Sequence, residues 1–378
     1  MSQLLRLTDR GLYCEPGDFY VDPWKSVERA VITHAHSDHA QAGSSAYLAV
    51  RDGANLLRTR LGDEARIETV EYGQSVSMNG VQVSVHPAGH ILGSAQVRVE
   101  HRGEVAVVSG DYKTQPDPTC APFELVRCHT FITEATFGLP IYNWPALDTI
   151  VDQINRWWQL NKEQGKASLI YCYALGKAQR LLRSVDTSIG PVFTHGAVER
   201  LNNQYRASGI ELPDTTFVSH VKKPREFQGS LVLAPPSAMG TVWLRRLGNV
   251  STAFASGWML VRGARRRRSV DRGFPLSDHI DWQNLNRIIG ETGAEHVLVT
   301  HGFANVMVRW LRERGVNADV LETPFEGEHE EASDRSAPDA SDDAPDAGDD
   351  APDAGDDAPD AGDDAPDTDG AVRGEGDQ

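Results

Sequence analysis

The stretch that decides the fold is His34-Ala35-His36-Ser37-Asp38-His39, in which three imidazoles and one carboxylate lie within six residues. It follows the run 29–33, which reads as a buried β-strand. A loop at the end of a strand can direct several ligand atoms at one point, and these atom types suit Zn²⁺ or a similar divalent ion. A bare His-x-His pair is often an ordinary surface loop, but the longer pattern His-x-His-x-Asp-His favours a metal site.

Three further side chains could complete such a site. His90 lies in a glycine-containing loop, whereas Asp111 and His301 each stand just after an apolar strand. Taken singly, each has an ordinary alternative as a capping residue or as the hydrogen-bonded residue of a turn. A role in turns does not explain why all three residues follow strands in the same way as the His34 loop does. We therefore expect their side chains to lie close to the His34 loop in the folded protein.

Composition narrows the class of protein. The chain has 378 residues, of which 40% are hydrophobic, enough for two domains of ordinary size with real cores. It contains no run of about 18 or more apolar residues, and its N-terminus lacks the regions of a signal peptide, so no membrane association is expected. The cysteines form no Cys-x-x-Cys pair, which predicts reduced thiols in a cytoplasmic protein. They are Cys14, Cys120, Cys128 and Cys172.

The net charge of −17 is concentrated at one end of the chain. From Glu326 onward there are 21 acidic residues and two arginines, which leaves 35 basic and 33 acidic groups, or +2, in residues 1–325. The body is thus nearly neutral, and the total charge excludes no anionic substrate. From Ala337 the heptad Ala-Pro-Asp-Ala-Gly-Asp-Asp recurs, and its prolines and like charges predict a disordered tail. We favour a solubilising or salt-tolerance appendage over a partner-binding tail.

The pattern of predicted secondary structure changes twice along the chain. Up to about residue 139, short strands alternate with polar loops, including a hairpin around Asn79-Gly80. Helices then alternate with strands, until the first pattern resumes near residue 275. We therefore predict one domain from residues 1–139 and 273–325, an inserted domain at 140–272, and a tail at 326–378. Helices are expected at 145–164, 176–185, 197–207, 281–291 and 304–314. Strands of the inserted segment are expected at 168–173, 191–194, 216–219 and 231–234.

Over roughly residues 5–325, these motifs resemble the metallo-β-lactamase superfamily and, within it, the β-CASP nucleases. The metallo-β-lactamase motifs match Asp22, His34, His36, Asp38, His39, His90 and Asp111. The β-CASP motifs match Glu134, His279 and His301. The resemblance implies a mixed α/β (α+β) protein with a four-layer αββα fold, an inserted α/β β-CASP cap, and an active site in the cleft between the two.

The resemblance also implies roles for these residues. Two Zn²⁺ or similar ions would be held, one by His34, His36 and His90 and the other by Asp38, His39 and His301. Asp111 would bridge the ions, and Asp22 would orient the cluster by accepting hydrogen bonds. His279, held by the Glu134 carboxylate, would protonate the leaving oxygen of a phosphodiester. Alternatively, His279 could cap the helix expected at 281–291.

Two longer strings are similar to the ligase-associated DNA exonuclease branch: Tyr173 to Arg180, and Ser256 to Arg268. We therefore expect a DNA exonuclease that works with an ATP-dependent DNA ligase in repair. An RNA-processing nuclease, similar to archaeal cleavage and polyadenylation factors, is the first alternative. Many of those factors carry N-terminal KH-type RNA modules, which we do not expect here. A small-molecule metallohydrolase would not need Glu134, His279 and a cap, and a silent binding subunit would not keep every ligand.

Substrate contacts are expected from basic residues, because the substrate backbone is anionic. Candidates for phosphate binding are Lys177, Arg180, Arg262, Arg265, Arg266, Arg267 and Arg268, with Arg272 close by. The alternative for the arginine run is a solvated loop. Trp157 and Trp158 lie at helical spacing with apolar neighbours, so we predict that they belong to a core and not to a base-stacking platform.

Overall fold

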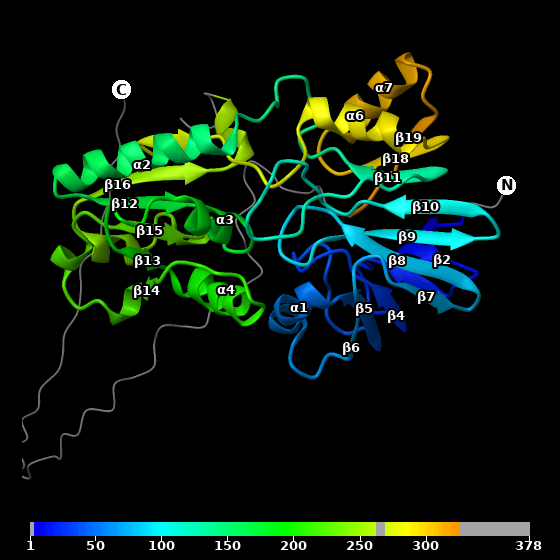
Figure 1. Ribbon diagram of the computed structural model, residues 1–378, viewed down its shortest axis with the longest axis horizontal. Coiled ribbons are helices and arrows are strands. Elements are labelled where there is room, and N and C mark those ends of the chain that lie inside the picture. The colour runs from blue at the N-terminus through cyan, green and yellow to red at the C-terminus, as the bar shows by residue number, and fades with distance from the viewer. Residues whose placement is uncertain (1–3, 262–268, 325–378) are drawn as a thin grey trace, which may run out of the picture. The chain divides into compact units, whose positions relative to one another are not determined.

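The computed structural model describes residues 4–261 and 269–324 (Figure 1). These residues all belong to the first of two units of the chain, Met1–Ala337. The predicted tail at 326–378 lies outside the described residues. The arginines predicted to contact phosphate at positions 262 and 265–268 also lie outside them.

The first sheet of the described chain follows sequence order. Its strands are β1 (Arg6–Thr8), β2 (Gly11–Cys14), β3 (Phe19–Val21), β4 (Arg29–Val31), β5 (Ala46–Val50) and β6 (Ile67–Val70). The pairs from β1 to β3 are antiparallel and those from β3 to β6 are parallel. The carboxyl ends of β3 and β4 therefore lie side by side, which brings Asp22 next to the His34 loop.

The second sheet has the order β19-β18-β11-β10-β9-β8-β7. Its strands are β7 (Ser75–Met78), β8 (Val81–Pro87), β9 (Ala95–His101), β10 (Glu104–Val108), β11 (Thr130–Glu134), β18 (His296–Thr300) and β19 (Ala318–Val320). The predicted β7–β8 hairpin is confirmed, with Asn79 and Gly80 at φ 49° and 83°, values typical of a tight hairpin turn. The neighbours β10, β11 and β18 are parallel, so their carboxyl ends meet at one edge.

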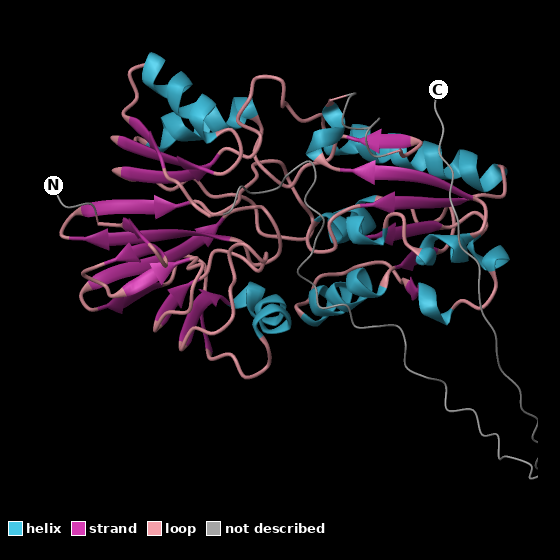
Figure 2. Cartoon of the chain, turned by 180° about the vertical axis from the view of Figure 1, so that it is seen from behind, coloured by secondary structure: helices cyan, strands magenta, loops and turns pink. Residues whose placement is uncertain are grey.

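Helices cover the outer faces of these two sheets, as predicted. Apolar side chains of both sheets, such as Val31, Val85 and Ile132, fill the space between them. The helices α6 (Trp282–Thr292) and α7 (Ala304–Glu313) pack on the other face of the second sheet, and α1 (Ala54–Leu61) packs on that of the first. The result is the four-layer αββα arrangement (Figure 2).

A third sheet, entirely parallel, is formed mostly by the segment predicted to be an insertion, and its last strand extends two residues past the predicted end at residue 272. Its order is β14-β13-β15-β12-β16-β17. Its strands are β12 (Ala167–Tyr171), β13 (Val192–Thr194), β14 (Thr216–Phe217), β15 (Leu231–Ala234), β16 (Val250–Ala255) and β17 (Arg272–Phe274). The helices α2 (Leu147–Glu163), α3 (Lys177–Ser184) and α4 (Gly196–Ala207) cover one face, and short 3-10 helices cover the other. The exact domain boundaries stay a prediction.

The expected helices are all present, within a few residues of their predicted ends. Three strands, β6, β16 and β17, were not predicted, and β14 is only two residues long where four were expected. Trp157 and Trp158 are 5% and 0% exposed, which confirms that they belong to a core. Among the described residues, no helix is both long and apolar enough to cross a membrane.

Candidate metal centre and acid–base pair

Strand ends deliver the candidate residues to one place. Asp111 follows β10, Glu134 is the last residue of β11, and His301 follows β18, so all three lie at the same edge of the second sheet. Gly110 allows this edge to approach the His34 loop, because a Cβ there would lie 2.7 Å from the Cβ of Thr33. Gly110 also has a φ of 56°, which favours glycine.

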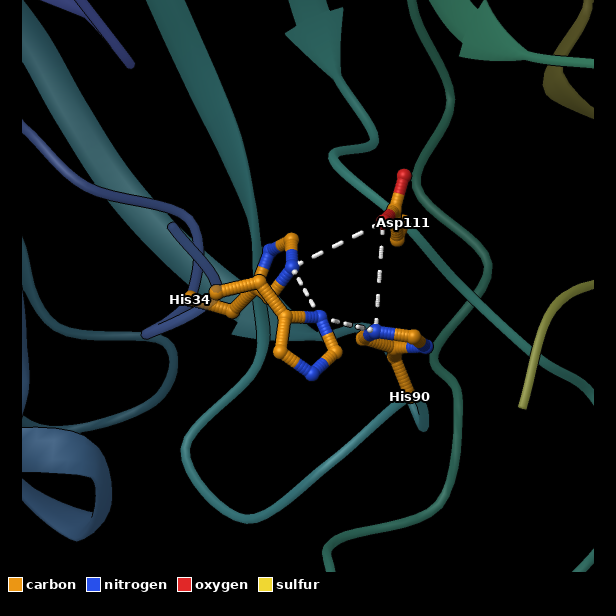
Figure 3. A group of neighbouring side chains, drawn as sticks. His34, His90 and Asp111 are labelled. Atoms are coloured by element: carbon orange, nitrogen blue, oxygen red, sulfur yellow. Dashed lines mark hydrogen bonds and ion pairs between the residues drawn. The ribbon is translucent and has the colours of Figure 1, made fainter. Parts of the chain in front are cut away.

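The first cluster consists of His34, His36, His90 and Asp111, whose ligand atoms all lie within 4.8 Å of one another. Nδ1 of His36 lies 3.0 Å from Nε2 of His34 and 3.1 Å from Nε2 of His90. Oδ2 of Asp111 lies 3.6 Å from Nε2 of His34 and 3.9 Å from Nε2 of His90 (Figure 3). Three imidazoles and a carboxylate that converge in this way form a suitable divalent-metal site.

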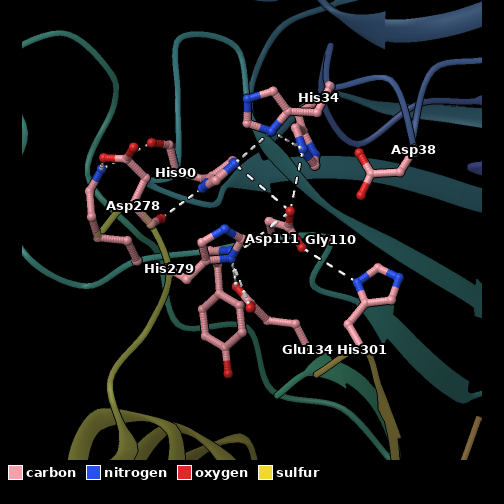
Figure 4. Close-up of polar contacts among 12 residues, drawn as sticks. His34, Asp38, His90, Gly110, Asp111, Glu134, Asp278, His279 and His301 are labelled. Carbon is pink, nitrogen blue, oxygen red and sulfur yellow. Dashed lines mark hydrogen bonds and ion pairs between the residues drawn. The ribbon is translucent and has the colours of Figure 1, made fainter. Parts of the chain in front are cut away.

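The second cluster consists of His39, Asp111 and His301. Nε2 of His39 lies 3.5 Å from Oδ2 of Asp111. Nδ1 of His301 lies 3.8 Å from Oδ1 of the same carboxylate (Figure 4). A carboxylate oxygen of Asp38 is 3.7 Å from Nε2 of His39. Asp111 is therefore shared by both clusters, the position expected of a bridging carboxylate.

The residues of the second cluster fit a bound cation. Nε2 of His39, Oδ1 of Asp111 and Nδ1 of His301 are buried, yet none of these atoms has a hydrogen-bond partner. Buried polar atoms are nearly always satisfied, so three unsatisfied atoms that face one another need an explanation. A metal ion held among them would supply it.

The outer ring nitrogens of four histidines face fixed partners. Nδ1 of His39 lies 2.7 Å from Asp22, and Nδ1 of His34 lies 3.1 Å from the hydroxyl of Thr33. Backbone carbonyls face the other two rings, at 3.3 Å from Nε2 of His36 and 2.7 Å from Nδ1 of His90. Donation at these nitrogens leaves the lone pair of the inner nitrogen directed at the cluster, which is the usual arrangement around metal-bound histidine.

Electrostatics favour the metal-binding protonation states in the first cluster. Burial, reinforced by the neighbouring histidines, lowers the pKa of His34 and of His90 well below its usual value, so both rings are neutral. Burial would raise the pKa of Asp111, but His39, His279 and His301 outweigh it and hold that pKa well below its usual value. Neutral imidazole and ionised carboxylate are the forms that ligate divalent ions. In the second cluster, burial would lower the pKa of His39, but the carboxylates of Asp111 and Asp38 outweigh it and hold that pKa well above its usual value.

Asp22 orients the second cluster from behind. One carboxylate oxygen accepts the Thr33 N–H at 2.8 Å, and the other accepts the Thr33 hydroxyl at 2.6 Å. The second oxygen also lies 2.7 Å from Nδ1 of His39. Asp22 has a φ of 43°, a conformation that aspartate tolerates better than most residues. The sequence identified Asp22 but missed Thr33, although a hydroxyl directly before His34 was a visible signal.

Glu134 and His279 form a buried acid–base pair. Nδ1 of His279 lies 2.9 Å and 3.1 Å from the two carboxylate oxygens of Glu134, which also accepts the N–H of Tyr112 at 3.0 Å. The same Nδ1 is 4.0 Å from Oδ2 of Asp111, so the pair adjoins both clusters. The N-cap of α6 is Asp281, whose side chain accepts the N–H of Asn284, so the alternative capping role of His279 is not needed.

Lys177 and Arg180 do not lie where direct phosphate contact would place them. They are 1% and 0% exposed, and each forms an ion pair with Asp278, at 3.5 Å and 3.1 Å. Their charges face a carboxylate of the protein, so the prediction of a direct phosphate contact is corrected for both. The start of α3 packs against the segment before α6, because Arg180 donates to Ser277 and Asp278.

Lys113, Asp117 and Asp278 were missed by sequence reasoning. Their side chains are 1%, 3% and 5% exposed and contact one another and the groups around His90. Asp278 directly precedes His279, and Lys113 and Asp117 form an (i, i+4) pair just after Asp111, so proximity to identified residues was the available signal.

Known proteins resemble the chain in sequence and in fold. It is 34% identical over 316 residues to a protein of Opitutus terrae named "Probable DNA ligase", a match that covers 82% of this chain and 30% of that protein. It is 24% identical over 222 residues to an "RNase J-like protein" of Methanocaldococcus jannaschii, covering 51% and 53%. It is 34% identical over 123 residues to "Cleavage and polyadenylation specificity factor subunit 3" of Dictyostelium discoideum, covering 32% and 16%. The chain belongs to the β-CASP family of metallo-β-lactamase proteins.

This β-CASP chain spans about half or less of the length of these relatives. Its fold is similar to a crystal structure of a protein of unknown function from Enterococcus faecalis V583, with a TM-score of 0.54 at 12% identity, covering 79% of this chain and 80% of that one. At this identity the likeness concerns the fold alone. No protein-family model matches the sequence. The β-CASP assignment therefore rests on the relatives, the sheet arrangement and the site residues together.

Proposed function

We propose that this β-CASP protein is a metal-dependent nuclease that hydrolyses phosphodiester bonds of nucleic acid. The observation that carries the proposal is the position of Asp111, which belongs to three sets of candidate groups at once. These are the first cluster, the second cluster, and the set with Glu134 and His279. Two cation sites beside a buried acid–base pair suit the hydrolysis of a phosphodiester, in which a nucleophile must be activated and a leaving oxygen must be protonated.

Zn²⁺ or similar ions in the two clusters would activate water and neutralise charge on the phosphoryl oxygens. Side chains of the protein would hold the ions and orient the reacting groups. His34, His36 and His90 would hold one ion, and His39 and His301 with Asp38 the other, with Asp111 shared. Asp22 fixes the ring of His39, since it accepts a hydrogen bond from the outer nitrogen.

His279 is the proposed general acid. Glu134 holds Nδ1 of the ring, so the opposite nitrogen, Nε2, is the one that would deliver a proton to the leaving oxygen. The carboxylate stabilises the imidazolium form, which must be present when the phosphorus–oxygen bond breaks. A small-molecule metallohydrolase would have no need of this second, buried pair, and this favours a nuclease over that alternative.

DNA is the proposed substrate, with exonuclease action in ligase-dependent repair. The support is the long match to the Opitutus protein named a probable DNA ligase, which covers most of this chain. The match covers 30% of the Opitutus protein, which leaves room in that protein for a ligase joined to the nuclease segment. We propose a corresponding functional link to an ATP-dependent ligase for this chain. RNA processing is the second candidate, and the names of the Methanocaldococcus and Dictyostelium relatives support it over shorter segments.

A side-by-side degradation assay tests the proposal. Single- and double-stranded DNA and RNA of matched sequence, labelled at the 5′ or the 3′ end, are incubated with the full chain and Zn²⁺ or Mn²⁺. We expect stepwise shortening of DNA, loss of the activity with chelator, and no activity in His36→Ala. Faster cleavage of RNA would favour the second candidate. Full activity in the chelated protein or in His36→Ala would contradict a metal-dependent nuclease.

A further inference from the structure

The two clusters are supported by different parts of the molecule. In the second cluster, the outer nitrogen of His39 faces Asp22, which directly follows β3. In the first cluster, Nε2 of His36 faces the carbonyl of Leu175, 3.3 Å away, and Nδ1 of His90 faces the carbonyl of Asp278, 2.7 Å away. Leu175 lies between β12 and α3 of the third sheet, and Asp278 lies between β17 and α6. Two ligands of the first cluster thus depend on segments outside the first two sheets.

These two segments are joined by a set of buried charges that we call the ion cluster. Its members are Lys113, Asp117, Lys177, Arg180 and Asp278, whose side chains are 0–5% exposed. Nη1 of Arg180 donates to Oδ1 of Asp278 at 3.1 Å and to the carbonyl of Ser277 at 2.7 Å. Arg180 therefore fastens α3 to the segment that carries both Asp278 and His279.

The ion cluster also touches His90 directly. Nζ of Lys113 donates to the carbonyl of His90 at 2.9 Å and to Asp117 at 2.8 Å. The backbone carbonyl of Asp278 lies 2.7 Å from Nδ1 of the same histidine (Figure 4). His90 is consequently held on its backbone by one member of the ion cluster and on its ring by another. A displacement of Asp278 would be passed on to the ring.

The charges of the ion cluster make it cohesive. It contains three cations and two carboxylates, and Asp278 lies within 3.9 Å of all three cations. Burial would raise the pKa of Asp278, but Lys177, Lys113 and Arg180 hold that pKa far below its usual value. Removal of one partner from such a buried set leaves another charge without compensation, so separating the segments that carry these charges would be costly.

We propose that the ion cluster couples the third sheet to the metal site of the first cluster, with Arg180 and Asp278 as positioning residues, while the second cluster is independent of it. The inference rests on the proposed function, since it takes both clusters to bind ions. It assigns a new role to Arg180, which acts through Asp278 on His90 and through the packing of α3 on Leu175 and His36.

Metal binding to the Arg180→Met and Arg183→Met variants tests the proposal. Arg183 lies on the same helix but is exposed, so it is the matched control. Folding of each variant is checked by thermal unfolding, and bound Zn²⁺ and Co²⁺ are counted and titrated against a chelator. We expect two ions in the wild type and the control. In Arg180→Met, we expect one site weakened about 10–100-fold and the other within about two-fold of wild type, the range measured for partners of metal ligands.

Asp22→Asn is the converse variant. It should weaken the other site about 10–100-fold and spare the one that Arg180→Met affects, because its carboxylate faces His39. The Co²⁺ absorption spectrum distinguishes which of the two sites is lost in each variant. Two sites of wild-type affinity in a folded Arg180→Met, or equal weakening of both, would overturn the proposal.

The wild-type chain provides a test that does not depend on a variant that folds. Hydrogen exchange is followed as Zn²⁺ is titrated in, and the proposal expects one of the two binding steps to slow exchange in 174–184. Exchange in this segment that responds to neither step would also overturn it. No readout here uses nuclease activity. A chain that shows this coupling but cleaves nothing would contradict the proposed function alone, and an active nuclease without the coupling would contradict only this inference.

Discussion

The first two sheets and the third sheet contribute to the same site in different ways. Every candidate ligand stands in a loop at the end of a strand of the first two sheets. The third sheet contributes the carbonyl of Leu175 and the buried cations of Lys177 and Arg180. The candidate ligands therefore lie at strand ends of the first two sheets. The orientation of their rings depends in part on contacts between segments more than a hundred residues apart, such as His36 and Leu175.

The largest effect is expected at Asp111, which both clusters share. Asp111→Asn removes a charge from both, so we expect a loss of about 10³-fold or more in kcat/KM, since metal ions contribute several kcal/mol to such reactions. Metal content and cleavage rate are the measurements. The comparison predicts a much smaller loss for Arg183→Met in the third sheet, and equal losses for the two variants would contradict it.

The second largest loss of activity is expected at the acid–base pair, Glu134 and His279. His279→Ala and Glu134→Gln are each expected to lower kcat about 10²–10⁴-fold, as for loss of a general acid, while metal content stays unchanged. A diester with a nitrophenol leaving group, which needs no proton, should be hydrolysed by the His279→Ala variant at close to the wild-type rate. An equal loss with both substrates would show that the histidine has another role.

A smaller effect is expected at Trp144, which lies in the segment that leads into α2. Its indole N–H donates to the carbonyl of His279 at 2.8 Å, and its ring packs on Phe137. Trp144→Phe removes one hydrogen bond, worth about 0.5–1.5 kcal/mol, so we expect a loss of up to about tenfold in kcat. A shift in the alkaline limb of the pH profile, where a general acid loses its proton, distinguishes misalignment of His279 from a general loss of stability, which thermal unfolding would report.

The smallest effect concerns stability of the third sheet and should depend on pH. Burial would raise the pKa of Glu199, but hydrogen bonds from Thr194, Thr215 and Arg206 lower it below its usual value. A carboxyl with a lowered pKa in the folded state stabilises the protein above its ordinary pKa and loses that contribution as the pH falls. Glu199→Gln should therefore destabilise by about 1 kcal/mol at pH 7 and by less at about pH 4. Denaturant unfolding at both pH values measures this, and an equal difference at both would contradict it.

The sequence indicated the candidate metal ligands more clearly than the buried charged residues that contact them. His34, His90, Asp111 and His301 stand after strands that hydrophobic patterns reveal. Asp111 and His301 meet because β10, β11 and β18 are parallel and share one edge. Arg180 and Lys177 were predicted to contact phosphate because they are basic and the substrate backbone is anionic. Their burial follows from Asp278, nearly a hundred residues later, and no local pattern signals such a pairing.

Two of the strands that the sequence did not predict, β6 and β17, are short and lie at the edges of their sheets. β17 has three residues, Arg272–Phe274, and one neighbour, β16, so its strand state depends on that neighbour more than on its own composition. The same holds for β6 at the edge of the first sheet. By contrast, the amphipathic helices α2, α6 and α7 carry their periodicity within themselves, and their positions were predicted closely.

Metal removal and restoration test the central claim most directly. The full chain is stripped with chelator, dialysed, and titrated with Zn²⁺ while cleavage of end-labelled DNA and bound metal are measured on the same samples. The account predicts no cleavage by the stripped protein and full recovery as the bound metal approaches two ions per chain. Cleavage by the metal-free protein, or two bound ions without cleavage of DNA or RNA, would contradict it.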